Sequence, residues 1–164
     1  MTTMDTRWAN CYVKAVTLLP NILAKEEARR KGYDDAIFVT ADGEVRECTS
    51  ANLFLVHGSR MMIPRRTESI LHGVTQGFIL DCAATIGIDV QERIVHIDSL
   101  HNADEVFMSS TAVEILAVTS IDNQPVGAGC VGPVTRRLCK EFKARSRAHT
   151  DDNDRSEQSS FEYV

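Results

Sequence analysis

The sequence predicts a mixed α/β fold, in which a largely antiparallel, barrel-like sheet carries helices on its outside. Two observations indicate this fold. Short apolar, β-branched runs are separated by tight turns, and Asp42-Gly43 is the strongest hairpin signal among them. Three longer segments repeat apolar residues every three or four positions, which is typical of helices with one buried face.

Length, charge and cysteine content narrow the class of protein. The 164 residues suffice for one domain with a sizeable core, and the net charge of −5 argues against non-specific nucleic-acid binding. No apolar run approaches the roughly 20 residues needed to cross a bilayer, and no signal peptide is visible. The five cysteines are odd in number and match no zinc pattern. We therefore expect a cytoplasmic protein with reduced thiols, no metal site, no membrane partner and no nucleic-acid partner.

The first half of the chain predicts one helix and a meander of strands. The helical pattern covers residues 14–31, but Pro20 favours a start at that residue, and Gly32 ends the helix. Lys14 then lies on the preceding segment, residues 10–17, which could be a strand. Short antiparallel strands are expected at residues 36–40, 44–47, 52–57 and 61–63.

The second half predicts two more helices and a polar tail. Helices are expected at residues 69–86, where Gly73 interrupts the pattern, and 133–143. Strands are expected at residues 88–97 (an edge strand), 105–108 and 114–121, with a short polar helix or turn at 99–104. Residues 145–164 are almost all charged or small and polar, so we expect a folded domain over 1–144 followed by a disordered tail.

Two segments could together hold an anion. Residues 71–75, Leu-His-Gly-Val-Thr, place a glycine and a hydroxyl where a helix starts, and the free amides of a helix start attract anions. Residues 109–111, Ser-Ser-Thr, follow a buried strand. By pattern alone, Lys14 and Glu47 are more typical of solvated side chains. These residues permit a phosphate site beside a lysine but do not establish one.

Motifs along residues 5–143 occur in an order that resembles one family. The motifs are Arg7-Trp8-Ala9-Asn10-Cys11-Tyr12-Val13-Lys14 with Leu18 to Ala28, Asp42 to Glu47 with Ser50-Ala51-Asn52-Leu53-Phe54, Ile70 to Thr75, Ala103 to Phe107, Ser110-Thr111-Ala112, and Gly129 to Thr135. This order resembles the class IV pyridoxal-phosphate aminotransferases. That family holds the D-amino-acid and branched-chain aminotransferases and aminodeoxychorismate lyase.

The resemblance implies a role for each residue that would contact the ring of pyridoxal 5′-phosphate. Lys14 matches the lysine that forms a Schiff base with the cofactor aldehyde and later moves a proton. Glu47 matches the acid that pairs with the pyridine nitrogen and keeps it protonated. Leu71 matches the residue that packs on the ring. Arg7 matches an arginine of the D-amino-acid branch, with a role in positioning the site.

The resemblance also implies a phosphate cup, a reaction and a subunit arrangement. Val74 and Thr75 match the helix-start amides and hydroxyl that hold the phosphate, and Thr111, assisted by Ser110, completes the cup. The implied reaction transfers an amino group between an amino acid, of D- or branched-chain type, and a 2-oxo acid. The implied assembly is a homodimer.

Departures from the family pattern leave alternatives open. Leu19 replaces a tyrosine common in branched-chain enzymes, so the D-amino-acid or lyase branch is closer. Gln76 replaces the usual arginine, and Cys48 replaces the usual glycine. The family lysine lies about halfway along the chain, but here it is Lys14. We therefore expect a truncated form without the N-terminal domain. The alternatives are a lyase-like enzyme, or a non-catalytic remnant or assembly module that needs a separate N-terminal partner.

Overall fold

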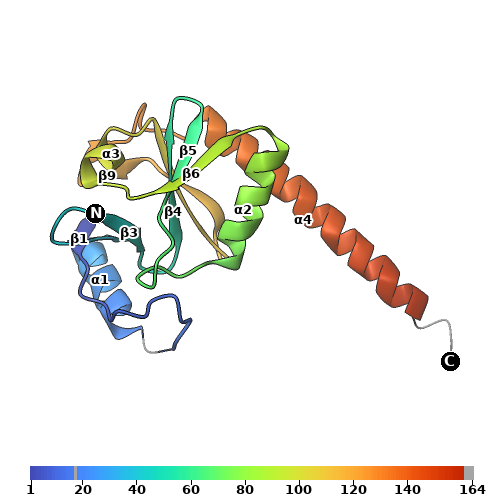
Figure 1. Ribbon diagram of the computed structural model, residues 1–164, viewed down its shortest axis with the longest axis horizontal. Helices are drawn as coiled ribbons and strands as arrows, with labels where there is room; N and C mark the ends of the chain where they lie inside the picture. The colour runs from blue at the N-terminus through green and yellow to red at the C-terminus, as the bar shows by residue number, and fades with distance from the viewer. Residues whose placement is uncertain (17, 161–164) are drawn as a thin grey trace.

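The computed structural model describes the backbone of residues 1–16 and 18–160 and the side chains of residues 1–16 and 18–148. It confirms a mixed α/β fold (Figure 1). In chain order the elements are β1 (Thr2–Met4), α1 (Leu19–Arg30), β2 (Ile37–Val39), β3 (Val45–Cys48), β4 (Asn52–His57), β5 (Arg60–Pro64), α2 (Val74–Thr85), β6 (Asp89–Arg93), α3 (Ile97–His101), β7 (Glu105–Ser110), β8 (Glu114–Val118), β9 (Ser120–Ile121), β10 (Gln124–Pro125) and α4 (Pro133–Ser160).

The described strands pair into three sheets. The largest has the order β6-β5-β4-β7-β8, the second has the order β1-β2-β3, and β9 and β10 form a hairpin. Most ladders are antiparallel, as expected, but β5 pairs with β6 and β1 pairs with β2 in parallel. The sequence did not predict β1, because Thr2-Thr3-Met4 has no strand pattern of its own. Its position depends on a distant partner, since the amide and hydroxyl of Thr2 both donate to the Asp122 carboxylate, at 2.9 and 2.6 Å.

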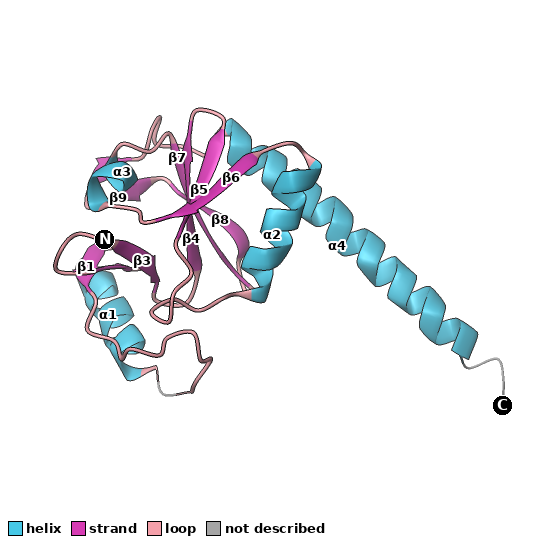
Figure 2. Cartoon of the chain, in the orientation of Figure 1, coloured by secondary structure: helices cyan, strands magenta, loops and turns pink. Residues whose placement is uncertain are grey.

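The five-stranded sheet separates two apolar clusters. Successive side chains of β4 point to opposite faces, so Leu53 and Leu55 join one cluster while Phe54 and Val56 join the other. The second cluster is covered by α2 and α4, which lie on the same side of the sheet (Figure 2). Helix α1 lies apart from them and packs through Ala24 and Ala28 in a small cluster with β2.

Several helix boundaries differ from those expected. Helix α2 begins at Val74 rather than residue 69, because Gly73 is extended (ψ 136°). Helix α3 covers Ile97–His101 rather than 99–104. No described helix has the length and apolar character needed to cross a membrane.

Helix α4 continues well beyond the expected end at residue 143. Its backbone is helical through Ser160, within the stretch 145–164 that the composition predicts to be a disordered tail, and residues 161–164 lie outside the described part. Arg145 still contacts the domain, because its Nη1 donates to Thr85 Oγ1 at 3.3 Å and its guanidinium lies 5.4 Å from the Phe78 ring centroid. We propose that the globular domain ends near Arg145, beyond which α4 projects away from the body (Figure 1).

Candidate active site

A buried carboxylate lies where three segments of the chain meet. Glu47, on β3, has a side chain that is 7% exposed. Its Oε1 accepts a hydrogen bond from Arg7 Nη1 at 2.6 Å, and its Oε2 accepts one from Asn52 Nδ2 at 3.2 Å. The backbone amide of Leu71, in the loop before α2, lies 3.2 Å from both oxygens. These donors orient the carboxylate and compensate for its loss of water.

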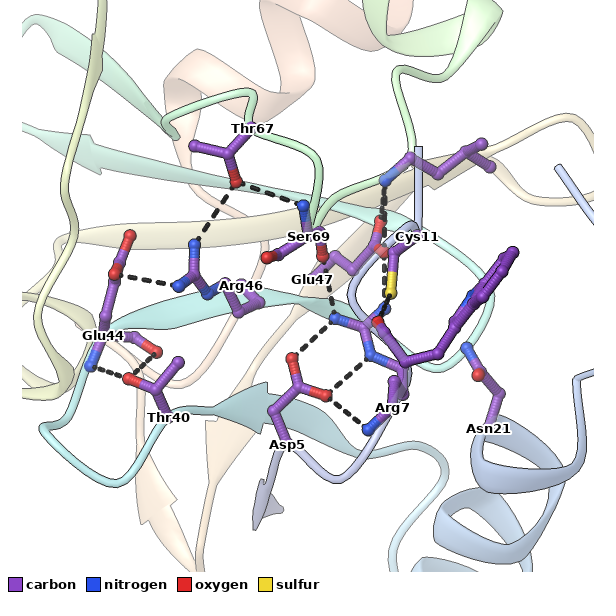
Figure 3. A network of polar contacts seen from close by, with 12 residues as sticks. Asp5, Arg7, Cys11, Asn21, Thr40, Glu44, Arg46, Glu47, Thr67 and Ser69 are labelled. Carbon is purple, nitrogen blue, oxygen red and sulfur yellow. Dashed lines mark hydrogen bonds and ion pairs between the residues drawn. The ribbon is translucent and has the colours of Figure 1, made fainter. Parts of the chain in front are cut away.

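Arg7 is held on two sides in this cluster, between Asp5 and Glu47 (Figure 3). Its Nε and Nη2 donate to the two oxygens of Asp5, each at 2.9 Å, and Nη2 also lies 3.2 Å from the Ser69 carbonyl. The guanidinium carbon sits 4.2 Å from the centroid of the Phe38 ring. With only 3% of its side chain exposed, Arg7 is a fixed structural cation rather than a mobile surface charge.

The two carboxylates around Arg7 respond to it differently. Burial raises the pKa of Glu47 above its usual value, and the charge and hydrogen bond of Arg7 lower it without offsetting burial completely. Burial also opposes the charge of Asp5, but there the two side-chain hydrogen bonds and the charge of Arg7 outweigh it and lower the pKa. The difference has two causes: Glu47 is buried more deeply than Asp5, and Arg7 gives Asp5 a bidentate contact but Glu47 a single one.

The N-terminus of α2 offers free amide groups beside this cluster. The amides that open a helix have no partner within it, and Gly73 provides no side-chain cap. A Cβ on Gly73 would clash with Asn52 Oδ1, so a side chain at this position would require the buried Asn52 to move. Val74 is exposed and Thr75 is half-buried. The helix start therefore forms a candidate anion site.

The end of β7 lies next to the same region. Ser109 pairs with Asn52 across the β4–β7 ladder, and its buried Oγ has no hydrogen-bond partner among the described residues. The same holds for Oε1 of Gln76, in the first turn of α2. Ser110 is half-buried and Thr111 is exposed. Ser109, on β7, and Gly73, at the start of α2, therefore both lie next to Asn52.

Lys14 does not join the bonded cluster. It lies in the loop between β1 and α1, where a strand was considered possible, and its side chain is exposed; Thr17, in the same segment, lies outside the described residues. No hydrogen bond or ion pair joins Lys14 to another described residue. The loop is nevertheless tied to the site, because the Tyr12 amide donates to the carbonyl of Glu68 at 3.1 Å, just before Leu71.

Sequence reasoning missed two residues that organise this site. Asp5 holds Arg7, and Asn52 bridges Glu47 to the Leu71 carbonyl, to which Nδ2 donates at 2.7 Å. An asparagine at the start of an apolar strand was the available signal for Asn52, whereas Asp5 lies in a polar stretch without any pattern. Among the described residues, no group of three or more His, Cys, Asp or Glu side chains could hold a metal ion.

Comparisons with known proteins converge on one family. Residues 1–121 match the family described as amino-transferase class IV. The chain is 40% identical over 134 residues to a branched-chain-amino-acid aminotransferase of Escherichia coli K12, covering 82% of this chain and 43% of that one. It is 37% identical over 138 residues to a D-alanine aminotransferase of Bacillus licheniformis, covering 84% and 48%.

Solved structures give the same picture. A branched-chain amino acid aminotransferase from Thermobaculum terrenum, in its pyridoxal-phosphate form, superimposes with a TM-score of 0.80 at 29% identity, covering 87% of this chain and 49% of that one. The Escherichia coli branched-chain enzyme gives a TM-score of 0.76 at 36% identity, covering 86% and 50%. The chain therefore spans about half the length of the relatives it matches.

Proposed function

This chain belongs to the class IV aminotransferase family, and on that premise we propose that it forms the cofactor-binding part of an aminotransferase. The proposed reaction transfers an amino group between an amino acid and a 2-oxo acid, in the cytoplasm. The observation that carries the proposal is the buried Glu47–Arg7 pair next to the uncapped start of α2. Relatives that act on branched-chain amino acids and on D-alanine match this chain over similar lengths, so either type of amino donor is proposed, with a lyase-like reaction as the alternative.

The residues present fit pyridoxal 5′-phosphate, the cofactor of this family. When bound, it supplies an aldehyde that condenses with an amine and a pyridinium ring that withdraws electrons from the reacting carbon. A buried carboxylate such as Glu47 can hold the proton on the ring nitrogen. The free amides of Val74 and Thr75 can bind the phosphate, and the orphaned oxygens of Gln76 and Ser109 lie in the elements that meet at this point.

Leu71 and Lys14 would complete the site. The amide of Leu71 donates to Glu47, so a ring whose nitrogen paired with Glu47 would have Leu71 nearby to pack on it. Lys14 would supply the amine and move a proton, and for this its exposed loop must carry Nζ inward. Arg7 would orient Glu47, and Ser110 and Thr111 would add hydroxyl donors to the phosphate.

Covalent trapping tests this proposal. We expect the purified chain to develop a visible absorption band with pyridoxal phosphate, and borohydride reduction to leave the adduct on the peptide that carries Lys14. Lys14→Ala should abolish the band and weaken binding at least about 100-fold, because the covalent link is lost. Lys31→Ala is the matched control, since Lys31 directly follows α1 and its exposed side chain pairs with Glu27, away from the site. An adduct on other lysines alone would contradict the assignment.

A second candidate function, an assembly module, is favoured by exposed apolar side chains. Among the residues whose side chains the structure describes, nine of the fourteen exposed large apolar residues lie within residues 4–23. We call these the N-terminal apolar patch: Met4, Trp8, Tyr12, Val13, Val16, Leu18, Leu19, Ile22 and Leu23. On α1, Leu19, Ile22 and Leu23 are 59–61% exposed. An exposed surface of this kind marks an interaction site. We propose that its occupant is the segment of the relatives that this chain does not span.

Sedimentation velocity with a hydrophobic dye tests this occupant. The chain alone should bind the dye and associate non-specifically as its concentration rises, and replacing Ile22 and Leu23 by lysine should suppress both effects because it removes exposed apolar surface. A discrete dimer that does not bind the dye would contradict the proposed occupant. That result would indicate that a second copy of the chain covers the N-terminal apolar patch, as in the homodimer that the family resemblance implies.

A further inference from the structure

Asp5 contacts Arg7, and Arg7 in turn contacts Glu47. Asp5 Oδ1 accepts hydrogen bonds from the Nε and the backbone amide of Arg7, at 2.9 and 3.1 Å, and its Oδ2 accepts one from Nη2 at 2.9 Å. Its own backbone amide donates to the Val39 carbonyl at 2.8 Å, at the end of the β1–β2 ladder. Only 12% of its side chain is exposed. Asp5 is therefore an anchored carboxylate with its oxygens directed at Arg7.

The charges of Asp5, Arg7 and Glu47 show what Asp5 adds to the Arg7–Glu47 pair. If Glu47 faced Arg7 alone, the guanidinium would neutralise the carboxylate. No net negative charge would then be left to pair with a protonated ring nitrogen. Asp5 saturates the Nε and Nη2 edge of the guanidinium and leaves Nη1 for Glu47. With both carboxylates ionised, the three buried side chains carry one net negative charge. That charge complements a cationic ring.

We propose that Asp5 is a positioning residue for Glu47. By clamping one edge of Arg7, it fixes Nη1 on Glu47 Oε1, and by offsetting the Arg7 charge it leaves Glu47 able to hold a proton on a ring nitrogen. The inference rests on the proposed function, because it assigns Asp5 a part in binding the same cofactor. It assigns Asp5 no contact with the cofactor.

The electrostatics of the cluster agree with this geometry. After burial, the charge of Arg7 is the largest influence on the pKa of Glu47, and lowers it, whereas the charge of Asp5 raises it. Arg46 acts on Asp5 and lowers its pKa. Cys11 is the other titratable group that interacts with Arg7, Asp5 and Glu47, and burial raises its pKa. Cys48 follows Glu47 in β3, and burial raises its pKa too, so both thiols are uncharged at neutral pH.

The direction in which the pKa of Glu47 shifts in Asp5→Asn distinguishes a positioning role of Asp5 from a purely structural one. In Asp5→Asn, the amide oxygen can still accept from Arg7 on one side, whereas the amide nitrogen faces the other Arg7 donor and that contact is lost. The counter-charge is also gone, so Arg7 acts on Glu47 alone. We expect the pKa of Glu47 to fall by roughly one pH unit, the scale of one nearby charge. If Asp5 only supported the fold, Arg7 would withdraw from Glu47, and the pKa would rise because a buried carboxylate had lost its cation.

The measurement uses the cofactor-free chain. Carbon-13 NMR of glutamate-labelled protein follows each side-chain carboxyl against pH, and Glu47→Gln identifies the signal of Glu47 by its loss. Asp35→Asn is the matched control, because Asp35 is also 12% exposed and pairs with Lys25 rather than Arg7. It should leave the Glu47 titration unchanged. A rise or no change of the Glu47 pKa in Asp5→Asn would overturn the proposal.

A second readout addresses the cofactor directly. Asp5→Asn should bind pyridoxal phosphate about 10-fold more weakly than the native chain, which corresponds to the same one-unit shift. Unchanged affinity would also overturn the proposal. Failure of the proposed function gives a different result, since it appears as the absence of a Lys14 adduct in the native chain.

Discussion

Replacing Arg7 by methionine should destabilise the protein by about 3–5 kcal/mol at neutral pH, the usual cost of removing one partner from a buried ion pair. Methionine is close to the arginine stem in length but lacks the guanidinium, so its contact with the Phe38 ring is lost as well. It leaves Asp5 and Glu47 buried next to one another without a cation. Both would lose their strongest hydrogen bonds as well.

The loss should depend on pH in a definite direction. In the native chain Arg7 lowers the pKa of Asp5, so the stability that Asp5 contributes is present above its unfolded pKa and is lost as the pH falls through its folded pKa. In Arg7→Met both carboxylates should have raised folded pKa values. The variant then loses stability as the pH rises through those values, and its deficit should shrink towards about pH 4.

Urea unfolding followed by the fluorescence of Trp8, the single tryptophan, measures this deficit. Arg30→Met is the matched control. Arg30 also pairs with a carboxylate, Glu26, but its side chain is 77% exposed, so the change should cost less than about 1 kcal/mol. An Arg7→Met variant as stable as this control, or one whose deficit grows at low pH, would show that Arg7 is not the buried counter-ion of the cluster.

Replacing Gly132 by alanine should cost roughly 2–3 kcal/mol, because it disrupts a buried helix cap. Glu105, on β7, accepts hydrogen bonds from the amides of Val134 and Thr135 at 2.9 and 2.8 Å and so satisfies the first turn of α4. A Cβ on Gly132 would lie 2.0 Å from the carboxyl carbon of Glu105. The carboxylate would have to leave both amides, and it has no exposed position to occupy instead.

Glu105→Gln tests the same cap from the other side. Its amide group would face one of the two helix amides donor to donor, so a similar loss is expected by urea unfolding. Gly77→Ala is the control, and we expect it to raise the free energy of unfolding rather than lower it. Gly77 lies within α2, and a Cβ there would meet no atom within 4 Å outside its own helix backbone, so alanine should stabilise the chain by up to about 1 kcal/mol. If Gly132→Ala were equally stabilising, Glu105 would not be the cap of α4.

Local signals were sufficient for the elements whose causes lie within a few residues. Pro20 and Gly32 predicted the limits of α1 because both act through their own backbone, and α1 covers Leu19–Arg30. The Asp42-Gly43 turn was predicted for the same reason, since Gly43 adopts a φ of +85° that favours glycine. The motif order also identified the family, because residue types and their spacing are properties of the chain itself.

The site itself needed the tertiary structure. Arg7 and Glu47 are 40 residues apart, and Glu105 lies 29 residues from the amide of Val134, so no periodicity could link them. The roles of Arg7, Lys14, Glu47, Leu71, Val74, Thr75, Ser110 and Thr111 stay predictions. The pattern alone predicted the exposure of Lys14 correctly, but the same reasoning was wrong for Glu47, which is buried. Asp5 was missed because its proposed role depends on Arg7, and only the fold brings Arg7 to Glu47.

The sequence by itself determined the class of fold, most of its elements and the family, since these follow from short-range patterns of residue type. Only the tertiary structure decided which charges meet, how deeply they are buried and which glycines leave room for a neighbour. The physical reason is that desolvation and Coulomb energy depend on distance in space and on the surrounding medium, and neither is encoded in local spacing. For this chain, the sequence gives a list of candidate residues, and only the tertiary structure shows that Asp5, Arg7 and Glu47 form a buried cluster.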